Sequence, residues 1–336
     1  MTKSGILASG NWIIDQVKVV DKFPDEEQLA NILHEYSSNG GSAYNVLKGL
    51  AKLNVKFPLS ALGLVGEDER GRSIIAECDK LNINTTHLQK TSSSHTSYTD
   101  VMTVKQTGKR TFFHQRGANA FLDTSHFNFK TSTAKIFHLG YLLLLDQLDL
   151  IGGDGKTGAA SIFRQAKDFG LITSADLVSE RSDRFKKIVP CSLPYIDYLF
   201  VNEFEAEMLS GIQTKNSRGE ITLDQCSYAA SKILEMGVLN SVILHFPGGA
   251  LAQSRNGDKI FQPSVQVKHG KIKGAVGAGD AFAAGVLMGI HEDWEMADCL
   301  KIGVCAAASS LFDVTSSEGI LPYQECLSLG DKYGYR

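Results

Sequence analysis

The sequence predicts an α/β protein with a parallel sheet and a smaller, separate β-sheet. From residue 135 onward, short apolar segments typical of buried strands alternate with helical segments. Such alternation is typical of a parallel sheet covered by helices on both faces. Two earlier regions, residues 12–40 and 96–116, are strand-like without a long helix between their strands. We expect them to pair as a small antiparallel sheet that projects from the main one as a lid.

The N-terminal elements are predicted from apolar runs and glycine signals. Residues 5–10 form a short apolar segment that ends in glycine, which indicates a buried strand. After the first lid region, Gly40 and Gly41 precede apolar residues at helical spacing through residue 53. This pattern predicts a helix with Ser42 as its N-cap.

The later elements follow the strand–helix rhythm. Apolar, strand-like runs occur at residues 135–139, 171–175, 199–202 and 241–245. Helical spacing occurs at residues 159–169 and 223–236. Neither a repeat nor a long linker divides the chain, so we expect one domain over residues 1–336.

Composition excludes several classes of protein. The 336 residues carry a formal net charge of −3, with 34 basic and 37 acidic side chains. This balance argues against a nucleic-acid stripe or a basic membrane-binding face. Polar residues interrupt every apolar run well short of a bilayer span, and the first residues lack a signal-peptide layout. The six cysteines form no CxxC pair, which favours reduced thiols and a cytoplasmic protein.

The most informative segment reads GAVGAGDAFAAGVLMGI from residue 274. Gly277, Ala278 and Gly279 lead into Asp280, and an apolar helical pattern follows. Small residues let a backbone approach a ligand, and free amides at a helix start favour anions. An aspartate there fits a carboxylate that takes a proton from an attacking hydroxyl while the amides hold a phosphoryl group. Alternatively, Asp280 only complements the helix dipole.

Polar residues near the N-terminal strand and helix are candidates for substrate binding. Asn11 and Asp15 follow the first strand, where α/β folds usually bind ligands, although such residues also form turns. Gly41 belongs to a glycine pair that suits either a hinge or a plain turn. Asn45 lies one turn into a helix where asparagine has poor propensity, which favours a polar contact.

The segment from Asn202 to Glu205 follows a buried strand and has two interpretations. Asn-x-x-Glu is a capping-box pattern. An amide and a carboxylate near a phosphate site would instead orient Mg²⁺ through its waters, because magnesium usually keeps several of them.

The glycine turn that follows His245 also has two interpretations. His245 precedes a Phe-Pro-Gly-Gly sequence in which Gly248 and Gly249 lead to another extended segment. The turn either forms the floor of a nucleotide pocket or belongs to an ordinary hairpin.

Two arginines, Arg110 and Arg116, flank the last strand of the predicted lid. Single surface arginines are usually solvated, but in a closing lid one would neutralise a carboxylate or phosphate. We therefore count Arg116 among the candidate substrate-binding residues and expect an anionic acceptor such as a sugar acid. Nothing matches a Walker A loop, a GxGxxG fingerprint or HExxH, so a P-loop NTPase, a dinucleotide dehydrogenase and a zinc enzyme are poorly supported.

The order of these signals resembles the ribokinase-like, or PfkB, family of carbohydrate and nucleoside kinases over nearly the whole chain. The segments that carry the resemblance are residues 40–45 (GGSAYN), 63–71 (GLVGEDERG), 108–111 (GKRT), 117–119 (GAN), 202–205 (NEFE) and 277–280 (GAGD). The resemblance implies a three-layer α/β/α body with a mostly parallel central sheet and a β-sheet lid. It also implies ATP as donor, Mg²⁺ as cofactor and a sugar-type hydroxyl as acceptor.

The resemblance also implies a role for each matched residue. Asp280 would be the general base, and the amides around Gly277, Ala278 and Gly279 would form the anion hole. The implied acceptor-binding residues are Asn11, Asp15, Gly41 and Asn45. The implied cofactor-binding residues are Asn202, Glu205, His245, Gly248 and Gly249, with Glu205 reaching the metal through water.

Three positions depart from the family pattern. Gly274 and Ala275 stand where relatives usually have Asp-Thr, and that aspartate helps build a monovalent-cation site. Its loss argues against potassium activation, and loss of the threonine alters the anion hole. Phe246 replaces a glycine that many relatives carry in the nucleotide loop, which changes the adenine or ribose contacts.

We therefore expect an ATP-dependent kinase of a monosaccharide or a close derivative. A nucleoside kinase is the alternative within the same class, with Trp12, Phe112 or Phe113 as stacking surfaces, although lid packing explains these residues equally well. A catalytically idle sugar- or nucleotide-binding protein is the alternative outside it. We also expect a homodimer through the lid, because a small exposed sheet leaves unpaired edges and apolar surface.

Overall fold

The computed structural model describes residues 3–336. Within them, nine strands form one sheet in the order β13-β12-β11-β10-β9-β8-β1-β4-β5. Its strands are β1 (Ile6–Gly10), β4 (Leu59–Gly66), β5 (Ile83–Thr91), β8 (Ile136–Leu142), β9 (Ile172–Leu177), β10 (Tyr198–Asn202), β11 (Ser241–Phe246), β12 (Gly249–Ser254) and β13 (Lys259–Pro263). The pairs from β5 to β11 are parallel, and β12 and β13 add two antiparallel strands at one edge.

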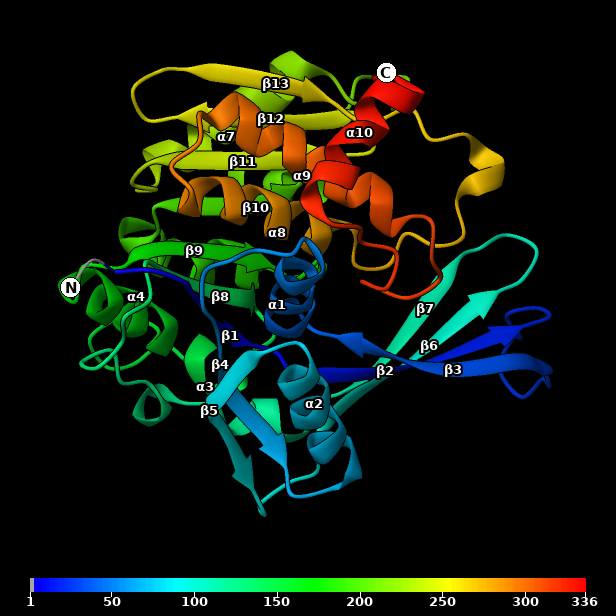
Figure 1. The fold of residues 1–336 in the computed structure, drawn as a ribbon, viewed down its shortest axis with the longest axis horizontal. Coiled ribbons are helices and arrows are strands. Elements are labelled where there is room, and N and C mark those ends of the chain that lie inside the picture. The colour runs from blue at the N-terminus through cyan, green and yellow to red at the C-terminus, as the bar shows by residue number, and fades with distance from the viewer. Residues whose placement is uncertain (1–2) are drawn as a thin grey trace.

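Helices cover both faces of this sheet and complete three layers (Figure 1). One face carries α1 (Ser42–Lys52), α2 (Glu69–Lys80), α8 (Ala278–His291), α9 (Met296–Ser310) and α10 (Tyr323–Tyr333). The other carries α3 (Asp146–Asp149), α4 (Gly158–Asp168), α5 (Arg184–Ile188), α6 (Glu203–Ser210) and α7 (Leu223–Glu235). The short 3₁₀ turns are Gly117–Phe121, Thr124–His126, Val189–Cys191, Leu193–Tyr195 and His269–Lys271.

The main sheet divides the apolar core into two parts, one on each face, because the side chains of a strand alternate between the two faces. Ile6 and Ala8 of β1 belong to the core under α1 and α8, whereas Leu7 belongs to the core under α4 and α7. Successive side chains of a strand point to opposite faces, so a wholly apolar strand feeds both cores. The predicted α/β/α class with a mostly parallel sheet is confirmed.

A second sheet of four strands extends away from the body, toward the right in Figure 1. Its order is β3-β2-β6-β7. The strands are β2 (Ile13–Val20), β3 (Ile32–Gly40), β6 (Ser97–Val104) and β7 (Arg110–Gln115). We call this sheet the lid, because its strands lie in the two regions that the sequence marks as strand-like and helix-poor.

The prediction that the lid is antiparallel is wrong at its centre, where β2 and β6 run parallel with Asp15 opposite Thr99. The reason is the path of the chain. β1 and β5 belong to the parallel part of the main sheet, and the chain leaves each of them to enter the lid in the same direction. Only the two hairpin-like pairs, β2–β3 and β6–β7, are antiparallel.

The start of α1 also differs from the prediction. Gly41, not Ser42, is the N-cap, and it has a positive φ of 83°. A Cβ at Gly41 would lie 2.2 Å from the carbonyl oxygen of Asn11, so only glycine fits. Ser42 is the first helical residue, and its hydroxyl donates to Asp176 at 2.5 Å instead of capping the helix.

None of the helices in residues 3–336 has the length and hydropathy needed to cross a membrane.

Candidate active site

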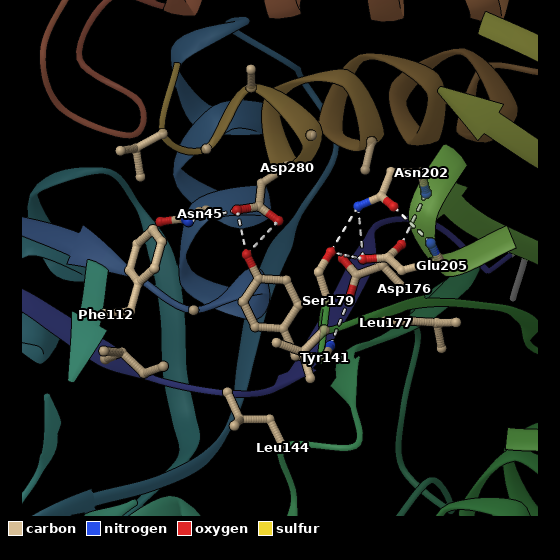
Figure 2. A pocket seen from close by; sticks show the side chains of 18 of the residues that line it. Asn45, Phe112, Tyr141, Leu144, Asp176, Leu177, Ser179, Asn202, Glu205 and Asp280 are labelled. Carbon is tan, nitrogen blue, oxygen red and sulfur yellow. Dashed lines mark hydrogen bonds between the residues drawn. The ribbon is translucent and has the colours of Figure 1, made fainter. Parts of the chain in front are cut away.

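Two cavities meet at the start of α8, beyond the carboxyl ends of the parallel strands. The first, of about 490 Å³, lies between the lid and the body, and we call it the acceptor cavity. Its polar lining comes from both parts: Asp15, Asn45, Thr99, Arg110, His114, Tyr141, Asp176, Ser179, Asn202, Glu205, His245 and Asp280. Figure 2 shows part of this lining, with Asp280 above Tyr141 and with Asn202 and Glu205 at one side.

The second cavity, of about 430 Å³, lies between β11, the segment after β13, and α9, and we call it the nucleotide cavity. Its walls are mainly apolar: Phe246, Val265, Val267, Ile272, Phe282, Val304, Ala307, Ala308 and Leu311. Apolar pockets with a few polar groups are the usual form of small-molecule sites. Asn202, His245, Ala275, Ala278 and Gly279 line both cavities, so the two spaces share a wall at the predicted anion hole.

The start of α8 leaves amides free at this shared wall. Gly277 is the N-cap in the left-handed region, with φ of 71°. The first helical hydrogen bond runs from the Ala281 amide to the Gly277 carbonyl at 2.8 Å. The amides of residues 278–280 precede that bond and have no backbone acceptor among the described residues. Such a turn is suited to bind an anion, as the sequence predicted.

Glycine is required at Gly277, and Gly279 leaves little room for a larger residue. A Cβ at Gly277 would lie 2.6 Å from the carbonyl oxygen of Ser316, in addition to the strain of its positive φ. A Cβ at Gly279 would lie 3.1 Å from the His245 ring. The small side chains therefore keep the turn close to its neighbours and open to the cavities.

Asp280 is buried, with 5% of its surface exposed, and two side chains hold its carboxylate. Asn45 Nδ2 donates to Oδ2 at 2.6 Å, and the Tyr141 hydroxyl donates to Oδ2 at 3.0 Å (Figure 2). Asn45 is itself oriented by Asn39, whose Nδ2 donates to its side-chain oxygen at 2.6 Å. The carboxylate therefore has a fixed orientation in the acceptor cavity.

Burial raises the pKa of Asp280 to about 7, with the nearby charge of Asp176 as the second cause. The hydrogen bonds from Asn45 and Tyr141 oppose this shift. Burial likewise raises the pKa of Asp15 to about 7, and the charge of Asp280 adds to it. A carboxyl group with a pKa near 7 exchanges protons readily at neutral pH, which is what a general base needs.

Tyr141 is a site residue that the sequence analysis missed. It follows β8 residue Gly140 with φ of 57°, uncommon for a residue with a side chain. Its amide donates to Asp176 Oδ1 at 2.6 Å, while its hydroxyl contacts Asp280. No local sequence signal marks a tyrosine in this role, because the left-handed turn depends on contacts made across the sheet.

Asp176 and Ser179 were also missed. Asp176 lies in β9, one residue beyond the predicted strand, and its carboxylate accepts from Ser42 and from the Tyr141 amide. Ser179 donates to Glu205 Oε1 at 2.7 Å. A signal for Asp176 was available, since an acidic residue at the carboxyl end of a predicted parallel strand lies where these folds bind ligands.

Both interpretations of Asn202 and Glu205 are compatible with the structure. The pair forms a capping box at the start of α6, with Asn202 Oδ1 accepting from the Glu205 amide and Glu205 Oε2 accepting from the Asn202 amide, each at 2.9 Å. The same two side chains line the acceptor cavity. Burial raises the pKa of Glu205 to about 8.

The oxygen donors at one end of the acceptor cavity fit a hydrated Mg²⁺ ion. Glu205, Asp176, Asn202 and Ser179 present oxygen atoms to one end of the acceptor cavity. Yet the described residues contain no group of three acidic, histidine or cysteine side chains placed to hold a metal directly. Oxygen donors without a complete cage fit a magnesium ion that keeps its waters and binds phosphates.

Three of the predicted site residues do not line either cavity. Asn11 is buried behind Tyr141, where its Nδ2 donates to the carbonyl of Gly140 at 3.4 Å. Arg116 forms an ion pair with Asp146 at 2.9 Å, so its charge is engaged outside the cavity. Gly248 lies in the β11–β12 turn, where its neighbours Pro247 and Gly249 line the nucleotide cavity and Gly248 does not.

The other residues predicted to bind the nucleotide line the second cavity. His245, Phe246 and Gly249 line the nucleotide cavity, and the turn is also a hairpin between β11 and β12. Burial lowers the pKa of His245 to about 4, so this ring is neutral at pH 7. Phe246 stacks on Phe261, with ring centroids 6.2 Å apart, and forms an apolar side of the cavity.

The structure shows what surrounds Gly274 and Ala275, the two residues that differ from the family pattern. A Cβ at Gly274 would lie 2.9 Å from the carbonyl oxygen of Asp313 and 3.1 Å from Val314. The backbone of this neighbouring loop therefore lies where a larger residue would stand. Ala275 lines both cavities but offers no hydroxyl to a ligand.

Of the aromatic residues considered for stacking, only Phe112 lines the acceptor cavity. Trp12 is fully buried, stacks on Tyr44 and donates from Nε1 to the carbonyl of Leu62 at 3.0 Å. Phe113 is exposed and does not line the cavity.

A buried carboxylate in a polar cavity, beside free helix amides that border an apolar cavity, is compatible with phosphoryl transfer. The profile described as "pfkB family carbohydrate kinase" matches residues 3–321. The chain belongs to this family, and the protein is a carbohydrate kinase by class.

Several known proteins are similar to it. The 5-dehydro-2-deoxygluconokinase of Clostridium perfringens is 25% identical over 291 residues, which is 83% of this chain and 80% of the relative. The nucleoside kinase of Methanocaldococcus jannaschii is 25% identical over 317 residues, or 94% and 93% of the two chains. The structure of Arabidopsis thaliana ribokinase complexed with ribose and ATP aligns with a TM-score of 0.78 at 20% identity, covering 98% of this chain and 99% of that one.

Proposed function

We propose that this protein transfers the γ-phosphoryl group of ATP to a hydroxyl group of a monosaccharide or sugar derivative, with Asp280 as the general base. One observation carries the proposal: the buried Asp280 carboxylate lines the acceptor cavity beside the first turn of α8, whose residues Ala278 and Gly279 line both cavities. The relatives named deoxygluconokinase and nucleoside kinase support a sugar-like acceptor.

In this mechanism the acceptor hydroxyl donates a hydrogen bond to Asp280. As the hydroxyl oxygen forms its bond to the γ-phosphorus, the bond from that phosphorus to the β–γ bridging oxygen of ATP breaks. The acceptor proton passes to the Asp280 carboxylate, and ADP leaves. Asn45 and Tyr141 orient the carboxylate throughout, since both donate to it.

The helix start contributes charge stabilisation. The amides of residues 278–280 face a phosphoryl group held at the shared wall, and they stabilise negative charge on its oxygens. This arrangement requires no reorganisation during transfer, because Gly277 fixes the turn through its left-handed conformation. The lid covers the acceptor cavity and limits access of water, which would otherwise compete as the acceptor.

Glu205 and Asn202, with Asp176 nearby, are the residues that would hold Mg²⁺ through its waters. The ion would neutralise charge on the nucleotide phosphates when bound. Burial raises the pKa of Glu205 to about 8, so this carboxyl would act as a carboxylate only when the charge of the bound ion lowers that pKa.

The test is ATP-dependent release of ADP in the presence of Mg²⁺ across ribose, fructose, sugar acids, sugar phosphates and nucleosides. We expect turnover with one acceptor class in the range of about 1–1000 s⁻¹. The Asp280→Asn variant should lose about 10²–10⁴-fold in kcat. Retained activity in that variant would exclude Asp280 as the base, while ligand binding without turnover in the wild type would contradict the kinase assignment.

A nucleoside acceptor is the second candidate, and one observation favours it. Phe112 lies on the cavity side of the lid with 58% of its surface exposed, which leaves a ring face free for a base. Replacing Phe112 by Leu would then raise the KM for nucleosides and leave the KM for simple sugars unchanged. Equal effects on both would assign Phe112 to lid packing.

Dimerisation through the lid also remains a proposal. The lid and its loops expose Phe23, Leu29, Ile32, Leu33 and Phe113, and its outer strands β3 and β7 have free edges. Light scattering after size exclusion is the test, with Leu33→Lys combined with Phe113→Lys as the disrupting variant. A wild-type mass near 36.5 kDa would mean a monomer and overturn the proposal. The cytoplasmic location stays a prediction.

A further inference from the structure

We propose that the acceptor carries an anionic group, a carboxylate or a phosphate, and that Arg110 of the lid binds it. This inference rests on the proposed kinase function and adds the chemical class of the acceptor to it. The observations that carry it are the direction of β7, the charges that line the acceptor cavity, and the lack of a carboxylate partner for Arg110 within the described residues.

The strand β7 places Arg110 on the cavity side of the lid. Arg110, Phe112 and His114 line the acceptor cavity, whereas Thr111 and Phe113 do not. This alternation is the period of a β-strand, so the three side chains share one face. Arg110 begins the strand, and its distance from Phe112 along the strand is about 7 Å.

Arg110 is the one fixed cation among the described residues that line this cavity. The other titratable nitrogen bases in the lining are His114 and His245, and burial lowers the pKa of each to about 4. Both histidines are therefore neutral at pH 7. Burial also lowers the pKa of Arg110, but a guanidinium remains charged under all ordinary conditions.

No ion pair joins Arg110 to a carboxylate within residues 3–336, unlike Lys18 and Arg116. Lys18 is paired with Asp100 within the lid, and Arg116, just beyond β7, is paired with Asp146. The titratable neighbour that affects the pKa of Arg110 is the Tyr36 phenol, whose own pKa is raised by burial, so the phenol is neutral at pH 7 and is no counter-ion. A half-buried guanidinium without a counter-ion favours an anionic ligand, because burial costs free energy that a partner offsets.

The positions of the acidic and basic side chains along the cavity determine which end of the acceptor lies at Arg110. Asp15, Asp176, Glu205 and Asp280 all line the cavity on the side of the body or the base of the lid. None of these carboxyl groups attracts an anionic group, whereas Arg110 attracts it to the lid. The acceptor hydroxyl is thereby directed toward Asp280. A planar guanidinium also binds a carboxylate or phosphate through two parallel hydrogen bonds, and this geometry fixes the orientation of the acceptor.

The experiment compares matched acceptors that differ in one anionic group. The pairs are gluconate with glucitol, and fructose 6-phosphate with fructose, which separate a carboxylate from a phosphate as the bound group. Each is measured as kcat/KM with saturating Mg-ATP, and as direct binding by calorimetry. For the wild type we expect at least one anionic member to be preferred by about tenfold or more.

The variants isolate the charge of Arg110. Arg110→Gln should lower kcat/KM for the preferred anion by about 10–100-fold and leave the neutral member nearly unchanged. Arg110→Lys should restore part of the loss, because the charge returns without the planar fork. Lys109→Gln is the matched control: this exposed neighbour does not line the cavity, so its charge removal should affect neither member.

The outcomes are distinguishable from failure of the proposed function. Turnover of neutral sugars without preference for an anion overturns the acceptor class and keeps the kinase function. Equal losses for both members in Arg110→Gln overturn the role of Arg110 as an anion ligand. Absence of phosphoryl transfer to every acceptor overturns both proposals.

Discussion

The hydroxyl of Tyr141 donates to both oxygens of the Asp280 carboxylate, at 3.3 Å to Oδ1 and 3.0 Å to Oδ2. A hydrogen bond to the charged form of a carboxyl group lowers its pKa, and this contact opposes the larger effect of burial on Asp280. Burial raises the pKa of the Tyr141 phenol well above its usual value, so it stays a neutral donor. The tyrosine therefore adjusts the base without titrating itself.

Tyr141→Phe should shift the acid limb of the kcat/KM profile to higher pH. Losing the donor raises the pKa of Asp280 by about one unit, so the base is protonated over a wider range. At pH 6 we expect kcat/KM to fall by about tenfold, with little change at pH 9. Tyr228→Phe, an exposed tyrosine on α7, is the control. A loss that is independent of pH would instead assign Tyr141 to packing.

Asp280→Asn should stabilise the protein at high pH while it removes activity. The folded-state pKa of Asp280, raised by burial to about 7, exceeds its unfolded value near 3.8. Ionisation of Asp280 therefore lowers the free energy of unfolding. The full loss is present above pH 7, and no loss is present below about pH 4. We expect a gain of about 1–3 kcal/mol in unfolding free energy at pH 8 and none at pH 4.

Chemical denaturation at the two pH values measures this effect. Asp331→Asn, at an exposed aspartate of α10, is the control and should change stability little at either pH. A lower stability of Asp280→Asn at pH 8 would contradict the burial argument.

Gly277→Ala should impair transfer more than it impairs folding. The new Cβ would lie 2.6 Å from the Ser316 carbonyl oxygen and would strain a φ of 71°, which moves the free amides of α8. We expect a loss of about 10²–10³-fold in kcat and about 1–3 kcal/mol in stability. Gly170→Ala is a matched control, with the same φ of 71° but open space around the Cβ. It should lose stability only, and an equal loss of kcat in both variants would show a general effect of strain.

Activity should not depend on potassium. Gly274 provides no carboxylate, and the backbone of Asp313 and Val314 lies where a larger side chain would stand. Initial rates in KCl and in tetramethylammonium chloride at equal ionic strength should therefore agree. A several-fold, saturable activation by KCl would reveal a cation site built from other groups.

The Arg110 and Arg116 pair illustrates a limit of reasoning from sequence. Both arginines flank one lid strand, and the sequence analysis placed only Arg116 among the binding residues. In the structure Arg116 is paired with Asp146, a residue of α3 distant in sequence, while Arg110 lines the cavity. The alternation of a strand places even-numbered and odd-numbered residues on opposite faces. Both arginines are even-numbered, so alternation does not tell which of them faces the cavity. The contact of Arg116 with Asp146 decides it.

The sequence by itself determined the α/β class, five strands and four helices of the body, and the glycine-rich turn that precedes Asp280. These depend on local patterns: apolar periodicity, small residues before a helix, and polar residues after strands. Only the tertiary structure decided the parallel β2–β6 pairing, the positive φ of Tyr141 and the meeting of two cavities at α8. Each of these joins segments far apart in the chain, and long-range packing selects among local conformations that the sequence leaves nearly equal in energy.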